Sequence, residues 1–179
     1  MHTNKTSSPW PAHRVQFITL CTHEKQPFLG RIFKDKNGYV WQPSLWGIAA
    51  EKGMRKLKLS SQLVMIQDYV IMPNHVHLLV LYRRCNDRVV KWFISHCKHT
   101  MAQHMLKARH TSDPLWETSY ESHYVQREHT QHALSQNIRE HQSRWHYDSL
   151  NAVLPRTKTV IKGDDTRNLT HLTDNDLSL

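Results

Sequence analysis

The feature that most constrains this chain is the run from Ile71 to Val80, IMPNHVHLLV, which sets two histidines one residue apart in an apolar segment. Its aliphatic and β-branched composition is typical of a strand, and Pro73 and Asn74 break the chain just before the pair. Side chains alternate between the two faces of a strand, so His75 and His77 project from the same side, about 6–7 Å apart. Two imidazoles in that arrangement can reach one metal ion.

The pair alone carries little information, because a chain with 15 histidines among 179 residues contains about one His-x-His pair by chance. The apolar surroundings make the pair more informative. Two imidazoles on a strand that is buried on both faces are costly unless hydrogen bonds or a metal satisfy them. Physical chemistry therefore leaves two interpretations open, a metal or catalytic pair and a pair of hydrogen-bonded core histidines.

Length and composition indicate one soluble globular domain. A chain of 179 residues with 39% hydrophobic and 22% charged residues can bury one core, and two full domains are not expected. No apolar run approaches the roughly 18–20 residues of a transmembrane helix, and the first residues lack the core of a signal peptide. We therefore expect a cytoplasmic protein without a membrane partner. The three cysteines show no paired spacing and are expected to be reduced thiols.

The charge balance indicates a polyanionic partner. Lysine and arginine outnumber the acidic residues, which gives the chain a formal net charge of +9. An excess of this size favours nucleic acid as the partner, although many basic proteins bind none.

The order of the predicted elements favours an α+β fold. Strands are expected at residues 14–22, 63–72, 75–82 and 123–126, and helices over residues 43–57, 89–107 and 130–144. Residues 23–42 carry proline, glycine and scattered charges, and are expected to form a long connection. We predict a small antiparallel sheet with helices packed on it, of the split βαβ, ferredoxin-like plan.

The composition also divides the chain into three parts. Residues 1–13 are polar and contain two prolines, so they are expected to form a loose N-terminal arm. Residues 14–154 contain all the predicted elements and form the domain. Residues 155–179 are polar with few apolar residues, and we expect a disordered tail.

Several stretches of the chain carry motifs that occur together in one protein family. The run DYVIMPNHVHLLV matches the motif Tyr-Val-x-Met-Pro-Asn-His-x-His nearly letter for letter, and RVQFITLCTHEKQPFLG resembles the family's opening strand. The segment from Trp116 to Arg127 matches a further motif at Trp116, Tyr120 and His123, and Ile94 to Lys98 resembles an Ile-x-x-Phe-Lys segment. On these residues the chain resembles the single-tyrosine HUH transposases, in particular the REP-associated tyrosine transposases.

The resemblance implies the HUH fold, in which the histidine pair of a small antiparallel sheet binds a divalent metal, Mg²⁺ or Mn²⁺. It also implies a homodimer that binds single-stranded or hairpin DNA and cleaves and joins it in DNA transposition. In such enzymes the metal polarises the scissile phosphate, and a helix tyrosine attacks the phosphorus to leave a 5′-phosphotyrosine. No organic cofactor is implied.

The chain departs from the family in its last helix. The family carries Tyr-Ile-x-x-Asn-Pro-x-x-Trp-x-x-Asp there, whereas this chain has Asn137 in the tyrosine position and keeps the register through Asp148. The resemblance therefore implies a member that has lost its nucleophile. Tyr147 is a weak substitute, because it lies about 15 Å further on if the helix continues. Tyr124 and Tyr120 are further substitutes, whose orientation the sequence leaves open.

A third metal ligand is predicted from the same helix. His141 lies one helical turn after Asn137 and on the same side, so its imidazole is our candidate. A third imidazole moves the metal preference from Mg²⁺ toward Mn²⁺, Co²⁺ or Zn²⁺, which accept nitrogen ligands more readily. The alternative is an exposed helix histidine without a ligand.

The predicted DNA contacts combine cations with aromatic rings. Phosphate contacts are expected from Arg83, Arg84, Lys91 and Lys98, and base stacking from Trp116 or Tyr120. The alternative for the cations is a solvated surface, and a tryptophan is more often part of a core than a stacking platform.

Three functions remain open at this stage. The first is a transposase-like protein that acts on hairpin DNA, with the nucleophile position lost. The second is a degenerate or domesticated module that binds hairpin DNA without catalysis. The third is a metal-dependent hydrolase that uses the histidine cluster.

Overall fold

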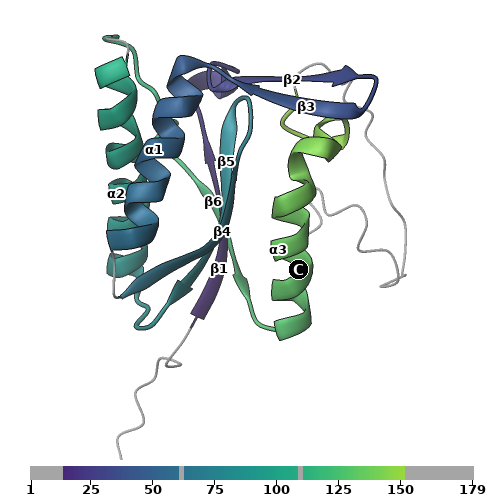
Figure 1. Cartoon of the computed structure of the whole chain (residues 1–179). Helices are drawn as coiled ribbons and strands as arrows, with labels where there is room; N and C mark the ends of the chain where they lie inside the picture. The colour runs from purple at the N-terminus through teal and green to yellow at the C-terminus, as the bar shows by residue number, and fades with distance from the viewer. Residues whose placement is uncertain (1–13, 61–62, 109–110, 152–179) are drawn as a thin grey trace, which may run out of the picture.

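The computed structural model describes residues 14–60, 63–108 and 111–151 of the chain (Figure 1). The predicted N-terminal arm and C-terminal tail, together with residues 152–154, lie outside the described residues. Within these described ranges, no helix combines the length and apolar composition that a membrane crossing needs.

A four-stranded antiparallel sheet forms the middle of the fold. Its strands follow the order β4 (Val64–Ile71), β5 (His75–Tyr82), β1 (Arg14–Cys21) and β6 (Glu121–Val125). The two central strands, β5 and β1, are paired along their whole length. The strands predicted from the sequence are confirmed, with β6 starting two residues earlier than expected.

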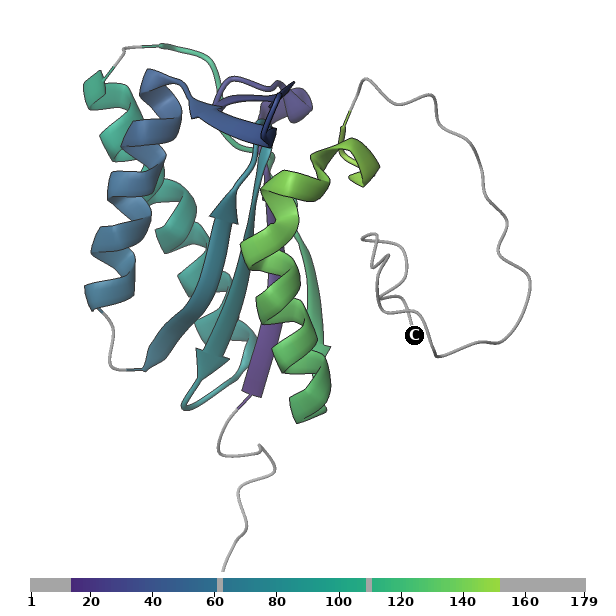
Figure 2. The same cartoon turned by 45° about the vertical axis from the view of Figure 1, so that its right-hand side comes forward.

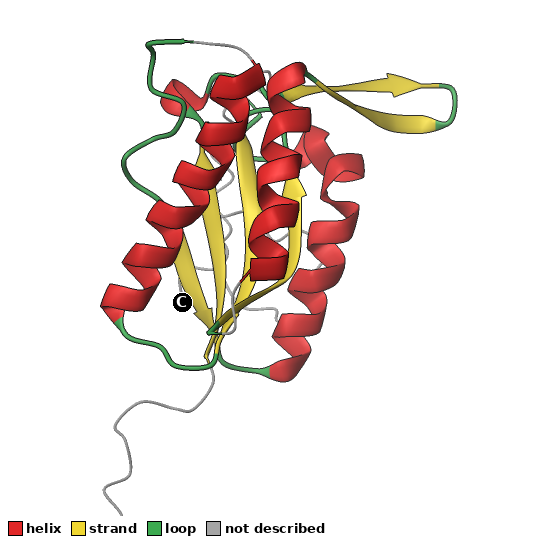
Figure 3. Cartoon of the chain, turned by 60° about the vertical axis from the view of Figure 1, so that its left-hand side comes forward, coloured by secondary structure: helices red, strands yellow, loops and turns green. Residues whose placement is uncertain are grey.

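Helices cover both faces of this sheet. α1 (Leu45–Ser60) and α2 (Asp87–Ala108) pack side by side on one face, and α3 (Glu128–Glu140) lies on the other (Figures 1 and 3). The helix predicted over residues 89–107 is α2, whose buried stripe recurs at helical spacing and includes Val90, Phe93, Ile94, Cys97 and Met101. The predicted α+β architecture is therefore confirmed.

Strand β5 supplies side chains to two separate cores, because its residues alternate between the faces. Val76, Leu78, Val80 and Tyr82 belong to the large core under α1 and α2. Leu79 instead belongs to a smaller core under α3, to which α3 contributes Leu134 and Ile138. The histidine pair shares the face of Leu79, so both imidazoles point toward α3.

The structure corrects the prediction that residues 23–42 are a long connection. They contain a short 3-10 helix, η1 (His23–Lys25), and a two-stranded antiparallel ribbon of β2 (Gly30–Asp35) and β3 (Gly38–Pro43). Gly38 makes the turn with a φ of 126°, a conformation that glycine adopts without steric cost. The ribbon projects from the sheet above α3 (Figure 1). Its strands escaped sequence analysis because they are short and show no clear apolar alternation.

The structure also corrects the end of the last helix, which was expected at about residue 144. α-Helical geometry stops at Glu140, and the chain continues as a second 3-10 helix, η2 (His141–Tyr147). The side chain of Gln142 donates a hydrogen bond to the carbonyl of Ile71 on the edge strand, at 3.0 Å. This contact and the tighter 3-10 turn accompany a bend of the chain at the end of α3, which Figure 2 shows.

Candidate functional site

The histidine pair of β5 is buried against the sheet. His75 and His77 are exposed to 0% and 1%. Their Nε2 atoms face each other at 3.0 Å. At that distance the two atoms can share one proton in a hydrogen bond, or both can present a lone pair to a further group. A divalent cation is such a group.

Two side chains from the end of α3 and beyond η2 complete a cluster around the pair. Nε2 of His141 lies 2.9 Å from Oδ2 of Asp148. The same carboxylate oxygen lies 3.4 Å from Nε2 of His75. One ligand atom from each of the four residues His75, His77, His141 and Asp148 lies within 4.8 Å of the others. The structure therefore brings His141 to the pair, where the sequence placed it.

Asp148 was not among the predicted ligands. The signal was present in the sequence, because Asp148 keeps the aspartate position of the family motif. It was passed over because a helix continuing to residue 144 carries the following residues away from the sheet. The change to a 3-10 helix at His141 is what returns Asp148 to the histidines.

Each imidazole has a hydrogen-bond partner on its far side, and the partner of His75 fixes its tautomer. The Nδ2 of Asn74 donates to the carbonyls of Leu150, at 2.8 Å, and Lys25, at 3.2 Å, so the Oδ1 of Asn74 must face His75. That oxygen lies 2.9 Å from Nδ1 of His75, which is therefore the protonated nitrogen and leaves Nε2 as a ligand. Thr19 Oγ1 lies 3.0 Å from Nδ1 of His77, where the hydroxyl can either accept or donate. The predicted core hydrogen bonds thus exist, and they orient the pair toward a metal.

The protonation state of the pair also suits a metal site. Burial lowers the pKa of His75 well below the ordinary histidine value, and positive charge on His141 and Lys25 lowers it further. Burial likewise lowers the pKa of His77, with the charges of His75 and His141 acting in the same direction. Neutral imidazole is the form that binds metals. Three nitrogens and one carboxylate oxygen fit a divalent transition ion better than Mg²⁺, which prefers oxygen ligands.

The predicted nucleophile position is occupied by an asparagine near the end of α3. Asn137 is half-buried on α3, one turn before His141. Tyr124 points to the opposite face of the sheet, where its hydroxyl lies 3.8 Å from Sγ of Cys85. Tyr120 packs against the large core on that same face. Neither side chain is placed to replace the missing phenol.

Tyr147 lies closer to the cluster than the sequence suggested. Because α3 ends at Glu140, Tyr147 directly precedes Asp148, and the separation expected for a continuing helix does not apply. Its side chain is 59% exposed. Its ring packs on the ring of His146, with the centroids 3.7 Å apart.

The predicted DNA-contacting residues divide into those that remain available and those that the fold uses. The Nζ of Lys98 donates to the carbonyls of Glu117, at 2.6 Å, and Ser119, at 2.7 Å. Trp116 is only 9% exposed and belongs to the core, so neither residue presents a free cation or stacking surface. Tyr120 is half-buried. These positions correct the prediction, because the segment after Asp113 packs onto α2 and the sheet instead of forming a platform.

Arg83, Arg84 and Lys91 are exposed, as predicted, but lie far from the histidines. The two arginines follow Tyr82, seven residues along β5 from His75, which is about 23 Å of extended strand. Lys91 belongs to α2, which covers the opposite face. These cations do not surround the cluster.

The β2–β3 ribbon places other cations at the histidine end of the sheet. Its base is joined to the turn before the pair by a hydrogen bond from the amide of Leu29 to the carbonyl of Pro73, at 3.0 Å. Tyr39 of β3 stacks on His146 of η2, with centroids 4.7 Å apart. The exposed cations of the ribbon and its turn are Arg31, Lys34 and Lys36. They were missed because residues 23–42 were expected to be a connection.

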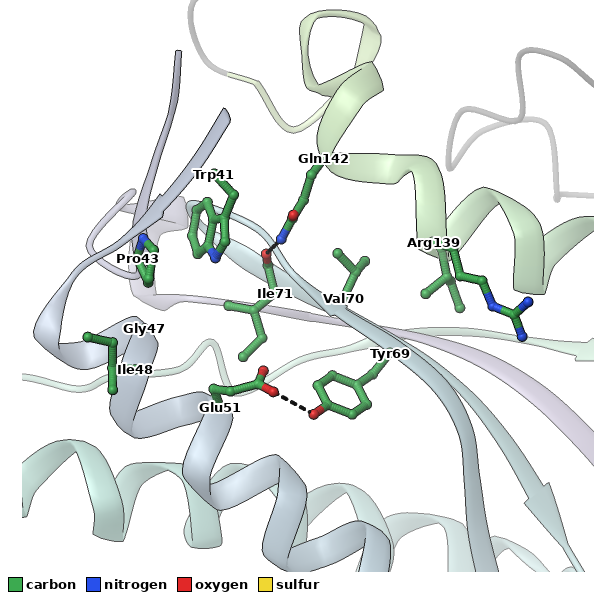
Figure 4. A pocket seen from close by; sticks show the side chains of 11 residues that line it. Trp41, Pro43, Gly47, Ile48, Glu51, Tyr69, Val70, Ile71, Arg139 and Gln142 are labelled. Atoms are coloured by element: carbon green, nitrogen blue, oxygen red, sulfur yellow. Dashed lines mark hydrogen bonds between the residues drawn. The ribbon is translucent and has the colours of Figure 1, made fainter. Parts of the chain in front are cut away.

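A groove of about 480 Å³ lies on the other flank of α3, between β3, α1 and the edge strand β4 (Figure 4). Its Glu51 accepts a hydrogen bond from the hydroxyl of Tyr69, at 2.8 Å. Arg139 is the cation among the described lining residues, and its guanidinium pairs with Asp68 at 3.3 Å. The polar groups of the groove are therefore paired with each other or with neighbours, and they do not converge on a ligand position.

Comparisons with known proteins support the fold. No protein-family model matches the chain, and no curated protein matches it. Among solved structures, a REP-associated tyrosine transposase bound to a REP hairpin is similar with a TM-score of 0.51 and 11% identity, over 80% of this chain and 74% of that one. A "putative transposase" from Deinococcus radiodurans R1 is similar with a TM-score of 0.48 and 18% identity, over 76% of this chain and 96% of that one. The chain thus has the α+β fold of the REP-associated tyrosine transposases.

Proposed function

We propose that this protein is a transposase-like protein that binds single-stranded or hairpin DNA without joining to it covalently. The shared fold supports DNA binding, since the neighbour of the same fold is bound to a hairpin. The net charge of +9 supports a nucleic-acid partner independently of the fold. Metal binding, DNA binding and covalent cleavage are each tested by a separate experiment.

The observation that carries the proposal is Asn137 on the face of α3 that meets the histidine cluster. Strand cleavage needs an oxygen nucleophile held in line with the phosphorus, at near-attack distance. A carboxamide is a poor nucleophile and is shorter than a phenol. Without a nucleophile the protein can bind DNA but cannot form a covalent phosphotyrosine.

The DNA surface follows from the same geometry. We infer that the backbone of the DNA lies along the β2–β3 ribbon, whose cations stand at the histidine end of the sheet. Phe33 of the ribbon is 42% exposed. The guanidinium of Arg31 lies 5.7 Å from its ring centroid, which makes a platform for a base. Base–aromatic stacking contributes about 1–3 kcal/mol per base, and phosphate contacts make affinity fall with salt.

The test compares two triple variants of equal charge change at opposite ends of the molecule. One replaces Arg31, Lys34 and Lys36 by alanine, and the matched control replaces Arg83, Arg84 and Lys91. Binding to a labelled hairpin, a single strand of the same composition and a random duplex is measured at several salt concentrations. The ribbon variant should lose at least about tenfold in hairpin affinity and about two units of salt slope.

The control variant should lose much less. A larger loss in the control places the DNA at the Arg83 end, as the sequence alone predicted, and removes the ribbon from the proposal. Equal affinity of the wild type for the hairpin and the random duplex would refute the preference for hairpin or single-stranded DNA.

A second candidate function is strand cleavage through Tyr147, which the chain places next to Asp148. The wild type and Tyr147→Phe are incubated with labelled hairpin and Mn²⁺, and denaturing gels are searched for a covalent adduct. We expect none in either protein, because the Tyr147 side chain is directed to solvent and packs on His146. A wild-type adduct that Tyr147→Phe removes establishes cleavage instead.

The homodimer implied by the family is also a proposal for this chain. Two carbonyls of the edge strand β4 are already occupied by side chains of the same molecule. Gln142 donates to Ile71 O at 3.0 Å, and Lys58 approaches Gln67 O at 3.5 Å. We infer that a dimer forms elsewhere than by extending the sheet at β4. Light scattering of the DNA-free protein measures the oligomeric state directly.

A further inference from the structure

We propose that the histidine cluster is a closed four-ligand site for a zinc-class divalent ion, in which Asp148 takes the position that a phosphate oxygen would need. This deepens the proposed function and rests on the same site. The metal then cross-links the last described segment of the chain to the sheet. It does not present an open coordination position to DNA.

The donor geometry fits a tetrahedral ion. Zinc binds imidazole and carboxylate at about 2.0–2.2 Å, so neighbouring donors of a tetrahedral site lie about 3.3–3.5 Å apart. The structure places His75 Nε2 3.0 Å from His77 Nε2 and 3.4 Å from Asp148 Oδ2. His141 Nε2 lies 2.9 Å from the same Oδ2. Small shifts of side chains bring these four atoms onto one ion.

The second argument is the fixed direction of the lone pairs. The Nδ1 atom of His75 donates to Asn74, so its Nε2 carries a buried lone pair that faces Nε2 of His77 at 3.0 Å. When Thr19 accepts from Nδ1 of His77, the second Nε2 also carries a lone pair, and a cation can bind between the two nitrogens. The four donors together satisfy an ion of charge +2 with one carboxylate, as in other structural and catalytic zinc sites.

The third argument is that Asp148 is held in place. Its Oδ1 accepts from the backbone amide of Leu150 at 2.7 Å, which leaves only Oδ2 for the cluster. Its own amide donates to Trp145 O at 3.1 Å, and its carbonyl accepts from the amide of Asn151 at 3.0 Å. The carboxylate side chain is 2% exposed. Displacing it requires opening the turn after η2.

Closure distinguishes this site from one that works on a substrate. Structural zinc sites have four protein ligands, whereas catalytic sites keep a position for water or substrate. The side chains of His75 and Asp148 are 0% and 2% exposed, and His141 is 13% exposed. The missing tyrosine at Asn137 and the closure by Asp148 then act in the same direction, since both oppose strand cleavage.

The experiment uses the tag-free full chain, stripped with chelator and titrated separately with Zn²⁺, Co²⁺, Mn²⁺ and Mg²⁺. We expect one tight equivalent of Zn²⁺ or Co²⁺, the intense visible absorption of four-coordinate Co²⁺, and a rise in Tm that millimolar Mg²⁺ does not produce. Asp148→Asn should weaken Zn²⁺ binding on the order of 100-fold. The exposed carboxylate variant Asp113→Asn is the matched control and should bind as the wild type does.

The faint spectrum of six-coordinate Co²⁺, or Mg²⁺ binding as tight as Zn²⁺, overturns the closed site even if Asp148→Asn fails to fold. Unchanged Zn²⁺ affinity in a folded Asp148→Asn also overturns it. Hairpin binding is measured separately on the metal-free and loaded wild type. If neither the metal-free nor the metal-loaded protein binds the hairpin, the proposed function is refuted. The result of the metal titration is not affected by that outcome.

Discussion

The two faces of the sheet are held together in different ways. Among the described residues, twenty-three buried side chains form the core under α1 and α2, whereas six form the core under α3. The remaining area of the α3 face is given to polar side chains, above all the cluster of His75, His77, His141 and Asp148. One face therefore supplies most of the apolar burial, and the other supplies the chemistry.

The α3 face, which carries the histidine cluster, therefore depends more on polar side-chain contacts for its stability than the α1 and α2 face does. The short apolar contact of Leu134 and Ile138 holds α3, while Ser135, Arg139 and Gln142 bond it to β4. A face with few apolar contacts opens more readily than a continuous core. A metal bound at the cluster stabilises the face that has least hydrophobic support.

The largest expected effect compares two neighbouring residues of β5 that point to opposite faces. Leu78 is 0% exposed in the large core and Leu79 is 1% exposed in the small one. Leu78→Ala should cost about 3–5 kcal/mol and Leu79→Ala about 2–3 kcal/mol, because a small core relaxes around the cavity more easily. Urea unfolding of metal-free protein measures both. An equal or larger loss for Leu79→Ala means that the two faces contribute alike.

The next effect comes from metal and should be confined to the α3 face. At a free Zn²⁺ concentration about a thousand times Kd, the native state gains about 4 kcal/mol. Hydrogen exchange should slow most in η2 and residues 148–151, with little change in α1. Equal protection of α1 and η2 would show that the metal stabilises the domain as a whole and not one face.

Acid should weaken the metal-free protein through the same face. The pKa values of His75 and His77 are well below the ordinary value because of burial. The unfolded chain therefore binds more protons than the folded one below about pH 6.5, and stability present above that pH is lost as the pH falls. Each histidine contributes at most roughly 1.4 kcal/mol per pH unit. Urea unfolding from pH 8 to 5.5 measures the slope.

The exposed His99 on α2 provides the control for this titration. His99→Ala should keep the wild-type slope, because this exposed side chain lies on α2, away from the buried histidine pair. His77→Asn should flatten the slope if the variant folds. A flat wild-type profile would mean that folding does not lower the pKa values of His75 and His77.

The sequence predicted one face of the molecule better than the other. The apolar stripe of α2 and the alternation of β5 follow from helical and strand periods, which hold wherever a continuous core selects residues by burial. The pair of His75 and His77 was recognised from a short, specific motif. The alternation of β5 also predicted that the two histidines share one side of the sheet.

The features that were missed depend on backbone turns, which the hydrophobic periodicity of the sequence does not predict. The end of α3 at Glu140 rests on side-chain bonds such as Gln142 to Ile71, which are long-range in sequence. That turn decides whether Asp148 meets the histidines. The β2–β3 ribbon escaped for a related reason, since its residues pack on η2 through single contacts such as Tyr39 on His146. The prediction that Lys98 and Trp116 contact DNA treated polar and aromatic residues as exposed, whereas tertiary contacts engage both.

The smallest expected effect is on cleavage by Asn137→Tyr, and it bears most directly on how far the α3 face has changed. The substitution restores a phenol one turn before His141, so resemblance alone predicts some recovery of strand cleavage. The structure predicts almost none, because Asp148 Oδ2 lies 3.4 Å from His75 and 2.9 Å from His141, where a phosphate oxygen would have to enter. Labelled hairpin, Mn²⁺ and a denaturing gel measure the adduct, with Tyr147→Phe added to exclude the native phenol. A strong adduct would show that Asp148 moves aside when DNA binds and that the tyrosine alone was lost. A trace or no adduct, with hairpin affinity unchanged, means that the position of Asp148 prevents cleavage as effectively as the absence of the nucleophile.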